Sequence, residues 1–332
     1  MTTQNTLSQA ARERFRQWSG GRDRLPGQDL DRLAQDPQVR GQDAAILSVL
    51  KDLPAALGQQ DLTCQSLDQV PDRLEFRYCD SLERVNTPRS LFPQGDPDAR
   101  CVRQGDQPDC VLTSTCISLA TQRPESIIAM FEEGDKGLVL RLPGERGRCV
   151  SLPTDRELLS HSCAYQNGAW MTVLAKELGP VGRMVPAQAI KKVTGHKVDQ
   201  DMMFMTSERA TRQKLERAME KRAVVIAGRN GMDDQVAGLT KNHSYAVIGY
   251  DPAFARVRLQ DPEGNEPLDA QGKPKDGDLD GRFSLPISEF RSLFSSVHYE
   301  SVDQPSFWGS FLGKVKDAFS VPAGGDGGVP IS

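Results

Sequence analysis

The sequence predicts an α+β protein, with helices gathered in the first half of the chain and antiparallel strands in the second. Apolar residues recur at helical spacing over residues 6–18 and 41–57. From residue 223 onward, short strand-like runs alternate with turn residues. Helices and strands that are segregated in this way along a chain indicate α+β architecture.

Length and composition limit the classes of protein to which the chain can belong. Its 332 residues allow about two domains. A net charge of −4 gives no electrostatic footprint for nucleic acid, and no apolar run approaches the roughly 20 residues of a membrane span. Seven cysteines without a C-x-x-C pair argue against a zinc ribbon or a complete disulfide framework. Since the N-terminus lacks a secretory signal pattern, we expect a cytoplasmic site of synthesis, with non-classical secretion as an alternative.

Residues 1–85 are predicted to form a helical module. Its helices are expected at 6–18, 29–33 and 41–57. Residues 25–33 align without gaps on residues 62–70, with four identities in nine positions. The repeat resembles a degenerate pair of EF-hand hairpins, and chance similarity is the alternative. Neither copy has the acidic loop residues that bind calcium, so we expect the module to hold no metal.

A Pro- and Gly-rich linker over residues 86–109 is predicted to lead into a main domain at 88–301. In the main domain, helices are expected from residue 110 and at 125–133, 169–178, 211–221 and 287–294. Strands are expected at 137–142, 148–152, 223–227, 244–250, 256–260, 281–285 and 297–300. Residues 302–332 are expected to hold an amphipathic helix at 306–319 and a flexible end. Packing of this helix on its own domain is expected, with docking to a partner or a membrane surface as the alternative.

Cys110 is the first candidate for chemistry. It follows a loop rich in Gly, Asp and Pro and begins an apolar pattern of helical length. At the first turn of a helix, unpaired backbone N–H groups and the macrodipole favour negative charge. These conditions convert a thiol into a thiolate nucleophile. The alternative is that Cys110 is an inert, small buried residue.

His243 and Asp261 are the candidates for its partners. His243 stands at the start of one predicted strand, and Asp261 stands 18 residues later at the end of the next. Consecutive strands joined by a short loop are antiparallel neighbours, which brings the two residues together. A cysteine, a histidine that exchanges its proton and a carboxylate that orients the imidazole form the arrangement of acyl transfer. Taken alone, the histidine is more often a surface or core residue, and Asp-Pro-Glu-Gly is a turn.

Several motifs, in their order along the chain, resemble the core of calpain-type cysteine proteases, which belong to the papain-like superfamily. Gln104, Gly105, Asp109 and Cys110 match the family's motif at the start of the nucleophile helix. Residues 221–228 and 238–247, with Asp233 and Asp234 between them, resemble the approach to the family's histidine. Residues 261–264 fall on its Asn-Pro-Trp-Gly, and residues 280–283 and 287–294 resemble its terminal strand and helix.

The resemblance implies a papain-like two-lobed core. A helical lobe would carry Cys110, and an antiparallel β lobe would carry His243 and Asp261. Cys110 would be the nucleophile, His243 the general base and later acid, and Asp261 the residue that orients the imidazole. Gln104 would donate a side-chain N–H to the oxyanion hole, beside the backbone N–H of Cys110. The resemblance implies no cofactor for this chemistry.

The sequence departs from the family pattern at several positions. Val111 replaces the Trp after the nucleophile, and Pro108 replaces the Gly before Asp109. Asp261 stands where the family has Asn, and Glu263 stands where it has a Trp that would cover the orienting residue. These changes leave the proposed chemistry intact and put substrate preference in doubt.

Calcium is a separate question, because cores of this family are often switched by calcium. Residues 276–281 reproduce the first half of a calcium loop, with Asp278 and Asp280 as candidate ligands, but position 12 is Ile287. A solvated acidic turn is the alternative, and we predict no metal site.

Three functions remain open from the sequence. The first is a thiol endopeptidase that hydrolyses protein substrates, in the manner of a bacterial effector or toxin. The second is an acyltransferase or amidase of the same superfamily, which Asp261 suits equally. The third is a protein-binding module in which Cys110 is inert.

Overall fold

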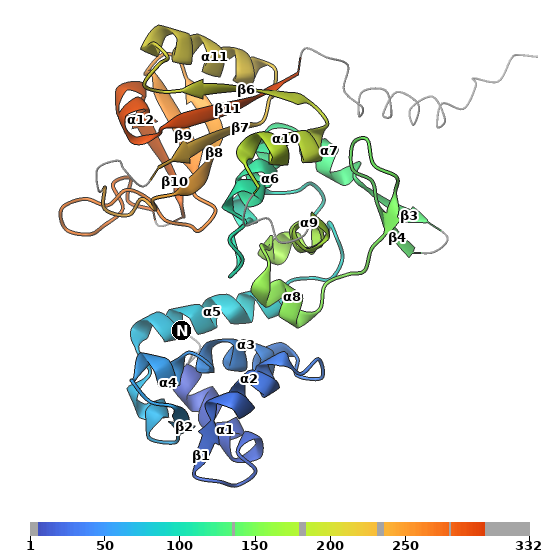
Figure 1. Cartoon of the computed structure of the whole chain (residues 1–332), viewed down its shortest axis with the longest axis vertical. Coiled ribbons are helices and arrows are strands. Elements are labelled where there is room, and N and C mark those ends of the chain that lie inside the picture. Colours follow the sequence, from blue (N-terminus) through green and yellow to red (C-terminus); the bar gives the residue numbers. More distant parts are fainter. Residues whose placement is uncertain (1–5, 135–136, 179–183, 231–235, 279, 303–332) are drawn as a thin grey trace, which may run out of the picture.

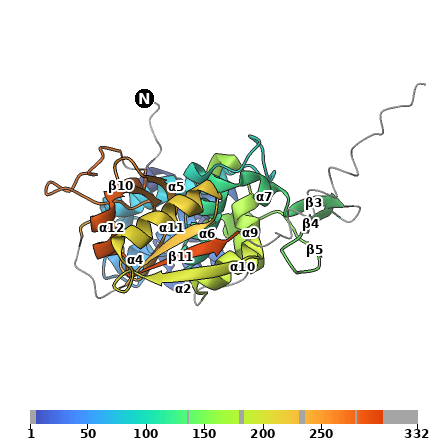
Figure 2. The same cartoon turned by 90° about the horizontal axis from the view of Figure 1, so that it is seen from above.

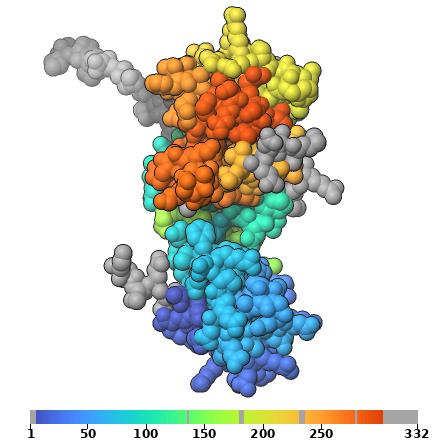
Figure 3. Space-filling model, turned by 90° about the vertical axis from the view of Figure 1, so that its left-hand side faces the viewer, coloured from blue at the N-terminus to red at the C-terminus, as the bar shows by residue number. Residues whose placement is uncertain are grey.

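The computed structural model of the chain describes residues 6–134, 137–178, 184–230, 236–278 and 280–302. Within these residues the protein is α+β, and every paired strand is antiparallel. The predicted α+β class is therefore confirmed. Along the longest axis, the N-terminal helices lie at one end, the large sheet lies at the other, and a helical layer lies between them (Figures 1 and 3). The loop with Asp233 and Asp234 and the amphipathic segment at 306–319 lie outside the described residues.

The N-terminal module contains two helix–strand–helix units. They comprise α1 (Leu7–Trp18), β1 (Arg24–Pro26), α2 (Gly27–Gln35), α3 (Gly41–Leu50), α4 (Leu53–Ala56), β2 (Asp61–Thr63), η1 (Ser66–Gln69) and α5 (Asp72–Val85). Leu25 of β1 pairs with Leu62 of β2, and these are equivalent positions of the sequence repeat. The helix expected at 41–57 is divided in two. Pro54 lies in the first turn of α4, where its missing N–H costs nothing, whereas it would break the interior of a longer helix.

The middle layer contains the helix that begins with the candidate nucleophile. Its elements are η2 (Ala99–Cys101), α6 (Cys110–Gln122), α7 (Pro124–Ile128), α8 (Asp155–Ser160), η3 (Tyr165–Asn167), α9 (Trp170–Leu178) and α10 (Pro186–Thr194). A small sheet of β3 (Phe131–Gly134), β4 (Gly137–Leu140) and β5 (Arg148–Cys149) projects from one side of it (Figures 1 and 2). The helix expected at 125–133 is wrong in its second half. Phe131 pairs with Leu140 and packs edge-on against Phe92, so tertiary contacts draw this segment into a strand.

The large sheet has the strand order β10-β9-β8-β7-β11-β6. Its strands are β6 (Lys197–Met202), β7 (Val225–Arg229), β8 (His243–Asp251), β9 (Arg256–Gln260), β10 (Arg282–Pro286) and β11 (Ser296–Ser301). The five strands predicted after residue 223 are confirmed as β7 to β11, whereas β6 was not predicted. Helices α11 (Glu208–Glu220) and α12 (Ile287–Leu293) pack on one face of the sheet, and α6 and α10 pack on the other (Figure 1).

Hydroxyl groups fix α6 against the large sheet. Ser114 Oγ donates to the carbonyl of Ser244 over 2.8 Å. Ser118 Oγ donates to the carbonyl of Val247 over 3.3 Å and accepts from the backbone N–H of Val225 over 3.0 Å. Both serines are buried, so these bonds satisfy backbone groups of β7 and β8 away from water. These bonds therefore fix the position of the helix that begins at Cys110 relative to the large sheet.

The described helices do not include a membrane span. None of them has both the length and the apolar character that a bilayer crossing requires.

Candidate active site

Cys110 is the first residue of α6 and is half-buried. The residue before it, Asp109, is 2% exposed, and its carboxylate accepts hydrogen bonds from Ser162 Oγ at 2.9 and 3.0 Å. Thr113 Oγ1 donates to the same carboxylate over 3.2 Å. Burial raises the pKa of Asp109, and the bonds from Ser162 and Thr113 oppose this shift. Asp109 thus anchors the junction between the loop and α6, which fixes where the Cys110 sulfur lies.

His243 and Asp261 lie side by side, as the antiparallel pairing of their strands predicts. His243 begins β8 and Asp261 follows β9, and these two strands are neighbours in the sheet. His243 Nε2 lies 3.0 Å from Asp261 Oδ1, and both side chains are buried. Asp261 Oδ1 also accepts from the backbone N–H of Glu263 over 2.7 Å. The carboxylate is therefore held in place while it orients the imidazole ring.

Cys110 is the second hydrogen-bond partner of the His243 imidazole ring. Burial lowers the pKa of His243, but hydrogen bonds to Asp261 and Cys110, together with their charges, raise it to about 10. Each ring nitrogen has one hydrogen-bonding direction, and Nε2 is committed to Asp261, so the contact with Cys110 falls to Nδ1. At neutral pH the ring is therefore protonated, the form that can donate a proton to a leaving group.

Gln104 lies where three segments of the chain meet. Its backbone N–H donates to the carbonyl of Pro262 over 2.7 Å, next to Asp261. Its carbonyl accepts from Arg84 Nη2 of α5 over 2.7 Å. Its side-chain Nε2 donates to the carbonyl of Gln107 over 3.2 Å, in the loop that leads to Cys110. An amide NH₂ group has two donors, so this bond leaves one for an incoming oxygen.

Gly105 follows Gln104 for a steric reason. A Cβ atom at this position would lie 2.5 Å from the backbone oxygen of His161. Only glycine permits this approach of two backbone segments, and the approach brings the Gln104 loop against the end of α8.

Sequence reasoning missed three contributors to the site. Ser162 anchors Asp109 from a remote position that no local pattern marks. Arg84 supports Gln104, and its only sequence signal is an acidic residue, Asp80, four positions earlier on the same helix. Glu263 was noted as a departure from the family pattern, but its carboxylate proves to be 4.0 Å from His243 Nδ1.

Metal-type donors come together in one place among the described residues. His243, Asp261 and Glu263 are the one group of three metal-type donors found close together among them, and His243 and Asp261 already bond to each other. Asp278 and Asp280, the candidate calcium ligands, belong to no such group within the described chain. Asp280 Oδ1 instead accepts from the backbone N–H of Arg282 over 2.8 Å, a bond typical of an acidic turn.

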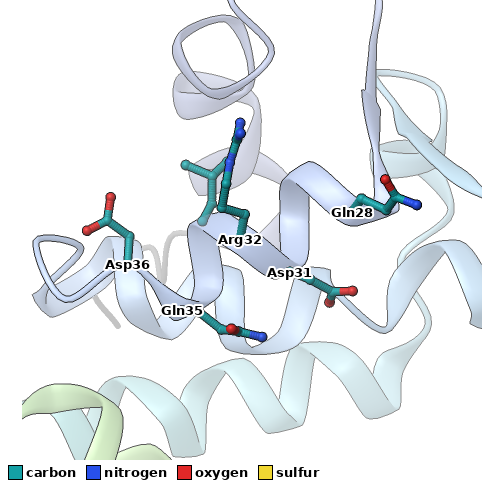
Figure 4. A pocket seen from close by; sticks show the side chains of 6 residues that line it. Gln28, Asp31, Arg32, Gln35 and Asp36 are labelled. Carbon is teal, nitrogen blue, oxygen red and sulfur yellow. The ribbon is translucent and has the colours of Figure 1, made fainter.

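Two surface hollows lie away from the triad. One lies over α2 and is lined by Leu33 and by polar side chains that point in different directions, and none of these residues belongs to the triad (Figure 4). The other is a groove of about 1030 Å³ between the N-terminal module and α8. Gln107 and His161 are among the residues that line it, so this groove reaches the loop that carries Gln104.

Neither the protein-family models nor the curated proteins give a match to the chain.

Proposed function

We propose that the chain is a cysteine endopeptidase with a papain-like, calpain-type two-lobed core. The observation that carries the proposal is the environment of His243, which meets Asp261 through Nε2 and Cys110 on its other side. A nucleophile, a base and an orienting group in one row support acyl transfer through a thioester. The position of Cys110 on a helix and of His243 and Asp261 beside antiparallel strands is consistent with the two lobes.

In the proposed reaction, the Cys110 sulfur attacks the peptide carbonyl carbon. A C–S bond forms, and the carbonyl electron pair moves to oxygen, which the backbone N–H of Cys110 and the side-chain amide of Gln104 stabilise. The C–N bond then breaks, and the amine leaves with the proton from His243. Water loses a proton to His243 as it attacks the thioester carbon. The C–S bond then breaks, which releases the carboxylic acid product and regenerates Cys110.

Acyl transfer to an amine is the second candidate function, because it uses the same three residues. Asp261 in place of an amide suits either reaction, and the acceptor of the acyl group distinguishes them. A protein-binding module with an inert Cys110 is the third candidate.

Incubation with casein tests the proposal. We expect the wild type and Cys149→Ala to release new fragments, and Cys110→Ala to release none. Cys149 is an exposed free thiol on β5 and serves as the matched control. Incorporation of a labelled amine without cleavage would instead favour acyl transfer. Equal behaviour of the wild type and Cys110→Ala in both assays would support the inert module.

A further inference from the structure

The carboxylate of Glu263 lies at the open side of the triad. Its Oε1 is 4.0 Å from His243 Nδ1. Because Nε2 is committed to Asp261, Nδ1 is the ring nitrogen left for Cys110. The side chains of His243 and Asp261 are 4% and 0% exposed, whereas that of Glu263 is 37% exposed. Glu263 therefore presents a negative charge to solvent beside an otherwise buried catalytic row.

This carboxylate is held in place by its neighbours. Its Oε2 accepts from Thr240 Oγ1 over 3.3 Å and from Asn265 Nδ2 over 3.2 Å. Its backbone N–H donates to Asp261 Oδ1, so the turn that positions Asp261 also positions Glu263. A charge held by side chain and backbone together is better suited to recognition than a freely rotating surface carboxylate.

The proposed reaction determines which part of the substrate lies beside the Glu263 carboxylate. When the C–N bond breaks, the nitrogen takes its proton from His243 Nδ1 and must lie within about 3 Å of it. The residue that follows the scissile bond is attached to this nitrogen. Its side chain is therefore within reach of Glu263.

We propose that Glu263 determines substrate specificity by selecting peptide bonds that are followed by Lys or Arg. The inference rests on the proposed endopeptidase function and names its substrate class. A partly solvated ion pair at this position is expected to favour a basic residue over a neutral one by about tenfold in kcat/KM. An acidic residue at the same position is disfavoured by like-charge repulsion.

A digest of a peptide library tests this specificity. The library is prepared with chymotrypsin, which cleaves after large apolar residues, so that it retains internal Lys, Arg, Asp and Glu, and new N-termini are identified by mass spectrometry. The readout is the frequency of Lys and Arg at the new N-termini relative to their frequency in the library. This ratio does not depend on overall rate, so a general loss of activity does not change it.

Four variants complete the experiment. We expect Glu263→Gln to abolish the enrichment of basic residues and Glu263→Lys to replace it with enrichment of Asp and Glu. Glu289→Gln is the matched control, because Glu289 lies on helix α12, is also 37% exposed and pairs with Lys275. It should retain the wild-type enrichment. Cys110→Ala defines the background.

The outcomes separate the two proposals. New N-termini without basic enrichment, or enrichment that survives Glu263→Gln, would overturn the role of Glu263 and leave the endopeptidase intact. No new N-termini above the Cys110→Ala background would overturn the endopeptidase itself, and the inference with it.

Discussion

At the scale of single residues, the charge of Asp261 has the largest consequence. An amide at this position would orient the imidazole without stabilising its charge, whereas the buried carboxylate does both. The pKa of His243 is raised to about 10, although burial alone would lower it. The protonated ring donates the proton to the leaving amine, so activity should persist into alkaline solution and fall as the ring loses its proton.

Asp261→Asn should move the alkaline limit of activity to lower pH. Removal of the charge lowers the pKa of His243, so the alkaline limb of the kcat/KM profile should fall by roughly 1 to 3 pH units. The measurement is a pH–rate profile of both proteins. Asp269→Asn, which removes a carboxylate that only bonds backbone groups in its own turn, is the control. An unchanged alkaline limb in Asp261→Asn would contradict the account of the ring's charge.

Asp261 also makes the free energy of unfolding depend on pH, through its effect on the pKa of His243. The folded pKa of His243 lies above its unfolded value of about 6.5, so the stabilising contribution is complete below pH 6.5 and is lost as pH rises toward about 10. The difference in unfolding free energy between the wild type and Asp261→Asn should therefore narrow across this window. Urea unfolding at pH 6, 8 and 10 measures this difference for the two proteins. A difference that widens as the pH rises would contradict the stabilising role of the protonated ring.

At the scale of elements, hydroxyl groups explain why α6 lies against the sheet. The buried face of this helix carries Ser114, Thr115 and Ser118 among its apolar residues. Ser118 both donates to β8 and accepts from β7. A helix with such a face can approach a sheet where backbone groups need partners, and it places its first residue, Cys110, beside His243 at the start of β8.

Ser118→Ala should destabilise the fold without removing a catalytic group. It leaves the buried backbone N–H of Val225 without its partner, which costs about 1–3 kcal/mol of unfolding free energy. Chemical denaturation measures this cost. Thr121→Ala is the control, because Thr121 bonds only the carbonyl of Ile117 in its own helix. Equal stability of the wild type and Ser118→Ala would show that the bond does not lock α6 to the sheet.

The sequence pattern predicted those elements whose local signals agree with their tertiary contacts. The strands after residue 223 were predicted because apolar residues dominate both of their faces or alternate along them. Strand β6 was missed because most of its residues are polar or exposed, and pairing with β11 holds it in the sheet. Helix α5 was missed because many of its residues are charged and because Arg84 and Ser81 interrupt the apolar pattern of its buried side.

The proximity of the candidate site residues could be predicted in part from the sequence. Antiparallel neighbours at a short loop place His243 beside Asp261, and the helix start places Cys110. The supports of Gln104 and Asp109 were not predictable, because Arg84 and Ser162 come from distant parts of the chain. Contacts of this kind depend on packing and not on local pattern.

At the scale of the whole molecule, the N-terminal module is joined to the candidate site through α5. Arg84 is 5% exposed, pairs with Asp80 at 2.6 Å and donates to the backbone oxygens of Gln104 and His161. Arg89 pairs with Asp155 of α8 a few residues later. The module therefore supports the loop that would supply the oxyanion hole.

Arg84→Met should reduce turnover more than it reduces the reactivity of the thiol. Loss of the bond to Gln104 disturbs the oxyanion hole, so kcat should fall by about tenfold or more, while alkylation of Cys110 by a small reagent stays near the wild-type rate. Arg77→Met on the same helix is the control, because Arg77 forms an exposed pair with Asp52. A parallel loss of both rates would indicate general unfolding instead of loop support.

The most direct test of the account is the rate at which iodoacetamide labels each free thiol at pH 7. Cys64, Cys79 and Cys149 are exposed, whereas Cys110 is half-buried, so accessibility alone predicts that Cys110 reacts more slowly than these three. The His243 imidazolium predicts the reverse order, with Cys110 labelled first and its advantage abolished in His243→Ala. Labelling of Cys110 that is no faster than that of the exposed thiols, or that is unchanged in His243→Ala, would contradict the account.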